Sequence, residues 1–131
     1  MTRVLVTGSR QWRDIETVDK VLSTFPPGTT IVHGCASGLD AIARSVAIRL
    51  GLVVEDHWPD YRPGKNFTAA TLARNEEMVR SGIDEVLVFP TGTWGTWGTS
   101  RGTWFTYQLA QKLGISTKVY REGSDLPVKD P

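Results

Sequence analysis

The sequence contains little that would build a disulfide, a metal cluster or a membrane anchor. It has one cysteine, Cys35, and two histidines among its 131 residues. A single cysteine excludes an intramolecular disulfide and a multi-thiolate zinc site, and two histidines with no clear third ligand give no reason to predict a metal site. No apolar run approaches the roughly 18 residues that span a bilayer. Residues 1–3 lead into strand-like sequence without the apolar segment of a signal peptide, so we expect a cytoplasmic protein.

An excess of charge of one sign is also missing. The chain carries 15 basic and 14 acidic side chains, a formal net charge of +1. This balance provides no broad basic surface, and duplex nucleic acid is therefore not expected as a partner. A hydrophobic fraction of 40% and a charged fraction of 22% are typical of globular domains. We predict one domain over residues 1–121 and a polar C-terminal tail over residues 122–131.

Short apolar runs alternate with helical patterns along the whole chain. Strands are predicted in the runs at 3–9, 29–34, 52–58, 84–90 and 116–120. The clearest helix has its apolar residues on one face: Leu39, Ile42, Ala43, Val46, Ala47 and Leu50. Further helices are expected from Ile15 to Phe25, at about 68–81, and from Trp104 onward. In the first of these the apolar residues share one inward face: Ile15, Val18, Val21, Leu22 and Phe25. This alternation predicts an α/β, doubly wound domain whose five-stranded parallel sheet has the order 3-2-1-4-5 and helices on both faces.

The unusual residues of the sequence fall at one predicted rim of this sheet. In a parallel sheet the strand-to-helix loops all lie at the carboxyl ends of the strands, where ligands bind. These loops are expected at 8–13, 34–38, 57–66 and 90–103. All five tryptophans lie in them or within one residue of them: Trp12, Trp58, Trp94, Trp97 and Trp104. The same loops carry five basic residues: Arg10, Arg13, Arg62, Lys65 and Arg101.

Three of the loops are rich in Gly, Ser and Thr immediately before a helix. Small residues let backbone N–H groups approach an anion, and the helix dipole adds positive potential. In GCASGLD we expect Ser37 to be the N-cap and Asp40 to complete a capping box. In GTSRGTW, Arg101 adds a planar donor for phosphate. Together these features indicate a site for a nucleotide or its derivative, with the base stacked on tryptophan.

Each of these features also has a purely structural interpretation. Gly-rich loops before helices are ordinary turns, and surface tryptophans often anchor protein interfaces. The repeated Gly-Thr-Trp of TGTWGTWGTSRGTW lengthens its loop beyond the usual range of about two to six residues. That length indicates a lid or an interface. Surplus aromatic residues at one rim, including the pair Trp104 and Tyr107, favour a homodimer or larger homo-oligomer.

Five short motifs in order suggest a family. VLVTGSRQW, IVHGCASGLDAIA, LARNEEMV, VLVFP and SRGTW together resemble the SLOG superfamily of Rossmann-like nucleotide binders, in particular its YspA-like, cpYpsA-related branch. The resemblance runs from about residue 3 to residue 120. It implies a Rossmann-like five-stranded sheet and a site for a nucleotide derivative, such as a signalling nucleotide, made by the two Gly-rich loops.

The resemblance also extends to the LOG phosphoribohydrolases, which release the base from a nucleoside 5′-monophosphate. Arg74 matches their helical arginine, and Gly102 and Thr103 match their Gly-Thr pair. Thr106 stands where those enzymes have a glutamate, and threonine cannot supply the carboxylate that N-glycosidic cleavage needs. Arg74 is thus a candidate catalytic residue, whose structural alternative is a surface ion pair with Glu77.

From the sequence, then, we predict a protein that binds a nucleotide or nucleotide-derived ligand at the carboxyl rim. The alternatives are a LOG-like phosphoribohydrolase and a module that binds single-stranded DNA or a protein partner. No cofactor is predicted, and Cys35 is expected to be a small buried cysteine. The expected ligand-binding residues lie in the rim loops or beside them: Gly8, Ser9, Arg10, Trp12, Gly34, Ser37, Gly38, Arg74, Asn75, Trp94, Trp97, Arg101, Gly102 and Thr103.

Overall fold

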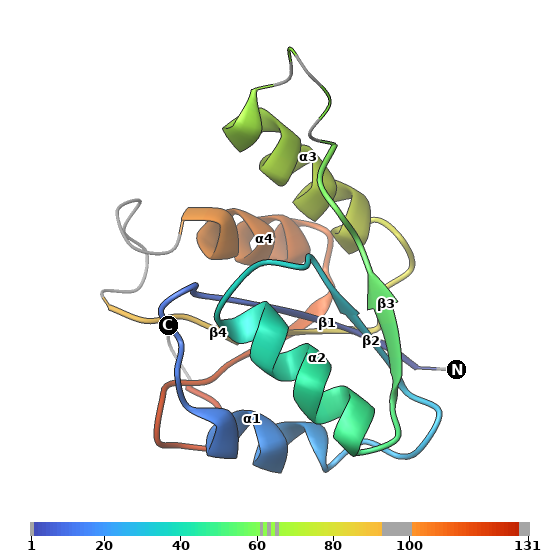
Figure 1. Ribbon diagram of the computed structural model, residues 1–131, viewed down its shortest axis with the longest axis vertical. Helices are drawn as coiled ribbons and strands as arrows, with labels where there is room; N and C mark the ends of the chain where they lie inside the picture. Colours follow the sequence, from blue (N-terminus) through green and yellow to red (C-terminus); the bar gives the residue numbers. More distant parts are fainter. Residues whose placement is uncertain (1, 61, 63, 65, 93–100, 129–131) are drawn as a thin grey trace.

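The computed structural model describes residues 2–60, 62, 64, 66–92 and 101–128 (Figure 1). Strands and helices alternate along the chain: β1 (Arg3–Gly8), α1 (Ile15–Leu22), β2 (Thr30–His33), α2 (Leu39–Arg49), β3 (Val53–Asp56), α3 (Phe67–Val79), β4 (Glu85–Phe89), α4 (Arg101–Lys112) and β5 (Ser116–Val119). The strands form one parallel sheet in the order β3-β2-β1-β4-β5. The predicted α/β fold and strand order are confirmed.

Helices cover both faces of this sheet. Figure 1 shows α1 and α2 on one face and α3 and α4 on the other. Successive residues of a strand point to opposite faces, and the core divides accordingly. Val4 and Val6 of β1 pack in the cluster that contains the buried residues of α1 and α2, whereas Leu5 packs with Met78 and Ala110 of α3 and α4. The carboxyl ends of the strands are thereby fixed between two helical layers.

In α1 and α2 the predicted inward faces are confirmed except at Ile15. Leu39, Ala43, Val46 and Ala47 of α2 are buried as expected. Ile15 is exposed, so its predicted inward position is wrong. Ile15 is the first residue of α1, and helical side chains lean toward the N-terminus, which carries this one past the end of the packed layer.

Asp14 caps α1 and also holds the segment that follows β5. Its carboxylate accepts hydrogen bonds from the Thr17 amide at 3.0 Å, the Thr17 hydroxyl at 2.5 Å and the Gly123 amide at 2.6 Å. The Thr17 hydroxyl is the largest influence on the pKa of Asp14, which is lowered from its ordinary value. Farther along, Val128 forms an antiparallel bridge with Val119. The described part of the tail therefore lies against the domain.

We expect Asp14→Ala to reduce the free energy of unfolding by about 1–2 kcal/mol, the usual value of an N-cap. Because the pKa of Asp14 is lowered in the folded state, its contribution is complete at neutral pH and is lost as the pH falls below the ordinary aspartate range. Urea unfolding at neutral and acidic pH measures both effects. Asp19→Ala, within α1, removes an exposed ion pair with Arg49 of α2 and should cost less. Equal losses for the two variants would contradict the capping role.

No helix in the described part of the chain is long and apolar enough to cross a bilayer.

Candidate ligand site

A cavity of about 330 Å³ opens at the carboxyl rim of the sheet. Its walls are the end of β1 with the loop that follows, the first turns of α2, the inner side of α3 and the first turn of α4. We call it the rim cavity. Eight residues predicted to bind ligand line it: Gly8, Ser9, Arg10, Arg74, Asn75, Arg101, Gly102 and Thr103. Its size suits a small ligand, since such pockets start at roughly 300 Å³.

The loop after β1 is held tightly at its base. A side chain at Gly8 would place its Cβ 2.5 Å from Leu39 Cγ and 2.7 Å from the Phe89 carbonyl oxygen. The Ser9 amide donates to Phe89 at 3.0 Å, and the Ser9 carbonyl accepts from the Leu39 amide at 3.1 Å. Arg10 is exposed beyond this anchor, with its guanidinium carbon 5.8 Å from the centre of the Phe67 ring. The loop therefore contributes a cation to the wall of the rim cavity, and the start of α3 contributes a ring beside it.

The start of α2 differs from the prediction. Gly38, not Ser37, is the N-cap, with φ 74° and ψ −122° and no side-chain cap. Ser37 is exposed, so the predicted capping box is wrong. The reason is a close approach: a Cβ at Gly38 would lie 2.5 Å from the backbone Cα of Arg10, so only glycine fits where the two loops meet.

Asp40 turns back toward the loop before α2 instead of closing a capping box. Its Oδ2 accepts from the Gly34 amide at 3.1 Å and from the Ala36 amide at 3.3 Å. The side chain is 7% exposed and lines the rim cavity. Burial raises the pKa of Asp40, and its hydrogen bond with the Ala36 amide and the nearby charge of Arg74 oppose that rise.

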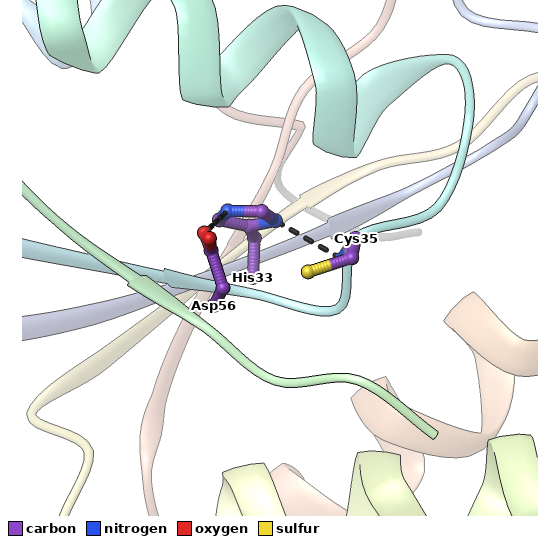
Figure 2. A group of neighbouring side chains, drawn as sticks. All are labelled: His33, Cys35 and Asp56. Atoms are coloured by element: carbon purple, nitrogen blue, oxygen red, sulfur yellow. Dashed lines mark hydrogen bonds and ion pairs between the residues drawn. The ribbon is translucent and has the colours of Figure 1, made fainter. Parts of the chain in front are cut away.

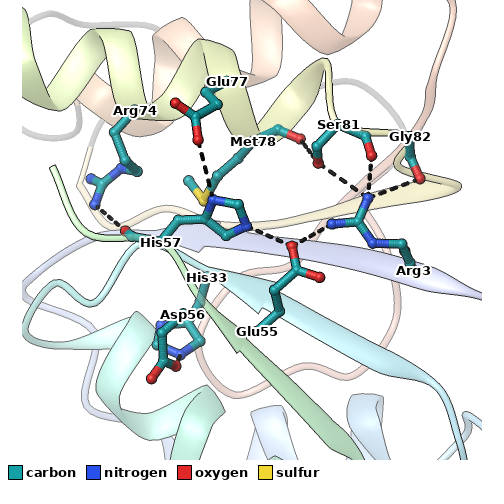
Figure 3. A network of polar contacts seen from close by, with 10 residues as sticks. All are labelled: Arg3, His33, Glu55, Asp56, His57, Arg74, Glu77, Met78, Ser81 and Gly82. Carbon is teal, nitrogen blue, oxygen red and sulfur yellow. Dashed lines mark hydrogen bonds and ion pairs between the residues drawn. The ribbon is translucent and has the colours of Figure 1, made fainter.

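Arg74 is buried and joins three segments, so the alternative of a surface ion pair with Glu77 is wrong. The guanidinium donates to the carbonyl of Gly34 and to Asn75 Oδ1 at 2.7 Å. It also donates to the carbonyl of His57 at 3.2 Å (Figure 3). Glu77 is exposed and lies 3.8 Å from His57 Nδ1 instead. Glycine at position 34 makes room for this inward guanidinium. A Cβ at residue 34 would lie 2.5 Å from the guanidinium carbon of Arg74.

The first turn of α4 forms the opposite wall. The helix begins at Arg101, three residues before the predicted start, so the SRGTW motif is largely helical. Gly102 and Thr103 belong to this first turn, whose amides have no partners within the helix. Asn75 Nδ2 donates to the Gly102 carbonyl at 3.4 Å and connects α3 to α4. Thr106 is buried, and its hydroxyl donates to the Gly102 carbonyl at 3.0 Å.

The tryptophans do not form one stacking surface. Trp12 is fully buried against Phe89, with ring centres 5.2 Å apart, and its indole N–H donates to the Asp14 carbonyl at 2.8 Å. A stacking role for Trp12 is therefore wrong, because its ring is enclosed. Trp104 stacks on Tyr107 at 5.6 Å. Trp58 is 69% exposed and lines a separate hollow beside α3. Trp94 and Trp97 lie outside the described residues.

Sequence reasoning found Arg74 and Asn75 but missed the contribution of the first turns of α3 to the rim cavity. Phe67, Thr68, Thr71 and Leu72 line it together with Arg74 and Asn75. No motif marks these four residues, although an aromatic side chain at the start of a helix that leaves a rim loop is a weak signal. Four of the predicted residues are not part of the described cavity lining: Trp12, Gly34, Ser37 and Gly38.

His33, Cys35 and Asp56 form a second group at the same rim (Figure 2). Their ligand atoms lie within 4.8 Å of one another. Both nitrogens of His33 are already used: Nδ1 accepts from the Cys35 amide at 3.0 Å, so Nε2 carries the hydrogen and donates it to Asp56 at 2.6 Å. The ring therefore holds the turn after β2 against β3.

Cys35 itself departs from the prediction. It is partly exposed, not buried, and its φ of 61° makes it the one non-glycine residue in the left-handed region within the described chain. Burial and then the negative charge of Asp56 raise the pKa of the thiol. The neighbouring helix terminus does not create a thiolate here.

A third polar network supports the far side of β3 (Figure 3). Glu55 accepts from Arg3 and pairs with His57 Nε2 at 2.5 Å. The hydrogen bond from His57 is the largest influence on the pKa of Glu55, which is lowered. Arg3 also donates to Ser81 and Gly82 in the turn after α3. This network joins β1, β3 and the turn after α3, and the His57 carbonyl connects it to Arg74 in the wall of the rim cavity.

Comparisons with known proteins agree with the motifs. A family model described as the YspA, cpYpsA-related SLOG family matches residues 2–64. The Gene 61 protein of Mycobacterium phage D29 is 40% identical over 125 residues, which cover 88% of this chain and 93% of that protein.

One solved structure has the same fold over nearly the whole chain. It is the X-ray structure of DNA processing protein A (DprA) from Streptococcus pneumoniae, with a TM-score of 0.73 and 21% sequence identity. The likeness covers 96% of this chain and 52% of the DprA chain, so this chain spans about half of that protein. At this identity the likeness shows the fold alone.

Proposed function

Because the chain belongs to the YspA, cpYpsA-related SLOG family, we propose that it binds a nucleotide or a nucleotide-derived ligand in the rim cavity. The observation that carries this proposal is the lining itself. Three arginines, the first turn of α4 and one aromatic ring surround a single space at the carboxyl ends of the strands. Basic donors suit a phosphate and a flat ring suits a base.

The phosphate is proposed to bind at the start of α4. Gly102 and Thr103 bring the first-turn amides of this helix to the cavity, and Arg101 adds a permanent positive charge beside them. Glycine at position 102 has no side chain to cover the backbone, so a ligand in the cavity can approach the backbone closely.

The base is proposed to stack on Phe67. This ring is 54% exposed, lines the rim cavity and lies beneath the Arg10 guanidinium. In this proposal Phe67, and not Trp12 as the sequence suggested, is the ring on which the base stacks. Trp94 and Trp97 remain predicted contacts outside the described residues.

Binding is favoured over N-glycosidic hydrolysis by the surroundings of Thr106. Its hydroxyl is committed to the Gly102 carbonyl, and the residue is not part of the described cavity lining. A hydrolase would need a carboxylate at this point to stabilise the ribosyl cation. Self-association through exposed aromatic residues such as Trp58 stays a prediction.

We expect Arg101→Ala to weaken binding of AMP or ADP-ribose by roughly 10- to 100-fold, since a hydrogen bond to a charged group contributes about 1.5–3 kcal/mol. Thermal shift against AMP, ADP-ribose, cyclic AMP and a short single-stranded oligonucleotide selects the ligand, and calorimetry measures its affinity. A ligand at 100 times its dissociation constant should stabilise the wild type by about 2.7 kcal/mol.

Arg80→Ala is the matched control for this experiment. Arg80 is exposed at the end of α3, away from the rim cavity, and pairs with Glu76 at 3.0 Å. Its loss should leave the affinity unchanged. Stabilisation by the oligonucleotide alone would favour the nucleic-acid alternative, and no stabilisation by any of the four compounds would contradict the proposal.

A further inference from the structure

The carboxylate of Asp40 is only half used by the fold. Oδ2 accepts both the Gly34 and the Ala36 amides, while Oδ1 has no hydrogen bond within the described structure. The side chain is 7% exposed and lines the rim cavity. Buried carboxylate oxygens rarely lack a partner, because desolvation without a hydrogen bond is costly.

Holding the loop before α2 does not explain this arrangement. A single acceptor oxygen is enough to bind the two amides, and the neutral side chain of asparagine offers one. A carboxylate adds a second acceptor and a negative charge on the wall of a cavity that also contains Arg10, Arg74 and Arg101. The second acceptor is therefore available to a ligand.

The chemistry of this oxygen restricts what it can contact. An ionised carboxylate oxygen accepts hydrogen bonds and donates none. It repels a phosphate group and the acceptor nitrogens of a base. Within a nucleotide, the donors that it can bind are the sugar hydroxyls and the N–H groups of the base, which in adenine are those of the exocyclic amine.

The position of Asp40 favours the sugar. Phe67, where the base is proposed to stack, lies in the first turn of α3, and this end of α3 stands away from the sheet (Figure 1). Asp40 lies in the first turn of α2 and is held to the loop that follows β2. The carboxylate is thus at the sheet end of the cavity, between the layers, where the group connecting base and phosphate would lie.

We propose that Asp40 Oδ1 accepts a hydrogen bond from a ribose hydroxyl of the ligand and thereby selects ribonucleotides over their deoxy analogues. The proposal rests on nucleotide binding in the rim cavity. It assigns Asp40 a direct contact with the ligand in addition to its support of the loop. Neither the sequence motifs nor the expected capping box indicates this contact.

Calorimetry of the full chain with AMP, 2′-deoxy-AMP and 3′-deoxy-AMP tests the proposal. The wild type should bind at least one of the deoxy analogues about 10- to 100-fold more weakly than AMP, as expected for loss of one charge-assisted hydrogen bond. In Asp40→Asn the amide oxygen can keep the two loop contacts, and the discrimination should fall by about 10-fold. Asp14→Asn alters a capping carboxylate outside the cavity and should keep the wild-type discrimination.

The outcomes separate this proposal from the one on which it rests. If the wild type binds all three nucleotides equally, the role of Asp40 is overturned and nucleotide binding stands. Full discrimination in a folded Asp40→Asn variant would overturn it as well. If the wild type binds none of them, and neither ADP-ribose nor cyclic AMP, nucleotide binding in the rim cavity fails too. The wild-type comparison decides even if Asp40→Asn does not fold.

Discussion

Gly38→Ala should destabilise the protein by about 3–5 kcal/mol, combining a strained backbone with overpacking. The backbone at this position has φ 74° and ψ −122°, a conformation that side-chain-bearing residues rarely adopt. An added Cβ would lie 2.5 Å from both Cα and the carbonyl carbon of Arg10. Backbone atoms cannot rotate away as a flexible side chain does, so the two loops must separate.

Gly28→Ala provides the matched control. Gly28 also has a positive φ, 92°, but an added Cβ there meets nothing within 4 Å. Its substitution should cost about 1 kcal/mol, the backbone term alone. Urea unfolding compares the two. Equal costs would mean that the close approach of the loops at Gly38 contributes nothing to stability.

Trp12→Ala should cost about 3–5 kcal/mol, the usual range for removing a large buried aromatic side chain. The ring is fully buried, packs edge-on against Phe89 at an interplanar angle of 78° and donates its N–H to the Asp14 carbonyl. The variant loses packing on the α1 and α2 side of the sheet and removes the donor of a part-buried carbonyl. Thermal and urea unfolding measure the loss.

Trp58→Ala is the corresponding change at an exposed ring of the same rim. With 69% of the side chain exposed, its loss should change stability by no more than about 0.5 kcal/mol. Comparing the two variants distinguishes the stability contribution of a core tryptophan from that of a surface tryptophan. A Trp12→Ala protein that keeps its stability but loses nucleotide affinity would restore the stacking role that the buried position excludes.

The sheet and its order were predictable because they follow from local patterns and general topology. Continuous apolar runs separated by amphipathic helices leave few arrangements other than a parallel sheet covered on both faces. The inward residues of α2 followed directly from helical periodicity. The exposure of Ile15 could not be predicted in this way, because periodicity alone does not say where a helix begins relative to the sheet on which it packs.

The details of the site depended on contacts between distant parts of the chain. Ser37 satisfies the local rules for an N-cap, but the approach of Gly38 to Arg10 decides where α2 starts. Arg74 has the spacing of a surface residue beside Glu77, yet carbonyls at positions 34 and 57 draw it inward. Neither partner can be identified from sequence spacing. The rim itself was predictable, because parallel strands bring their carboxyl ends together.

The location of the ligand is the central claim, and amide chemical shifts of the ¹⁵N-labelled protein during titration with AMP or ADP-ribose test it most directly. We predict that the largest shifts fall on residues 8–10, in the loop after β1, and on residues 101–103, in the first turn of α4, because both segments line the rim cavity. The account would be contradicted by shifts confined to the opposite rim of the sheet, or by no shifts at all with either compound.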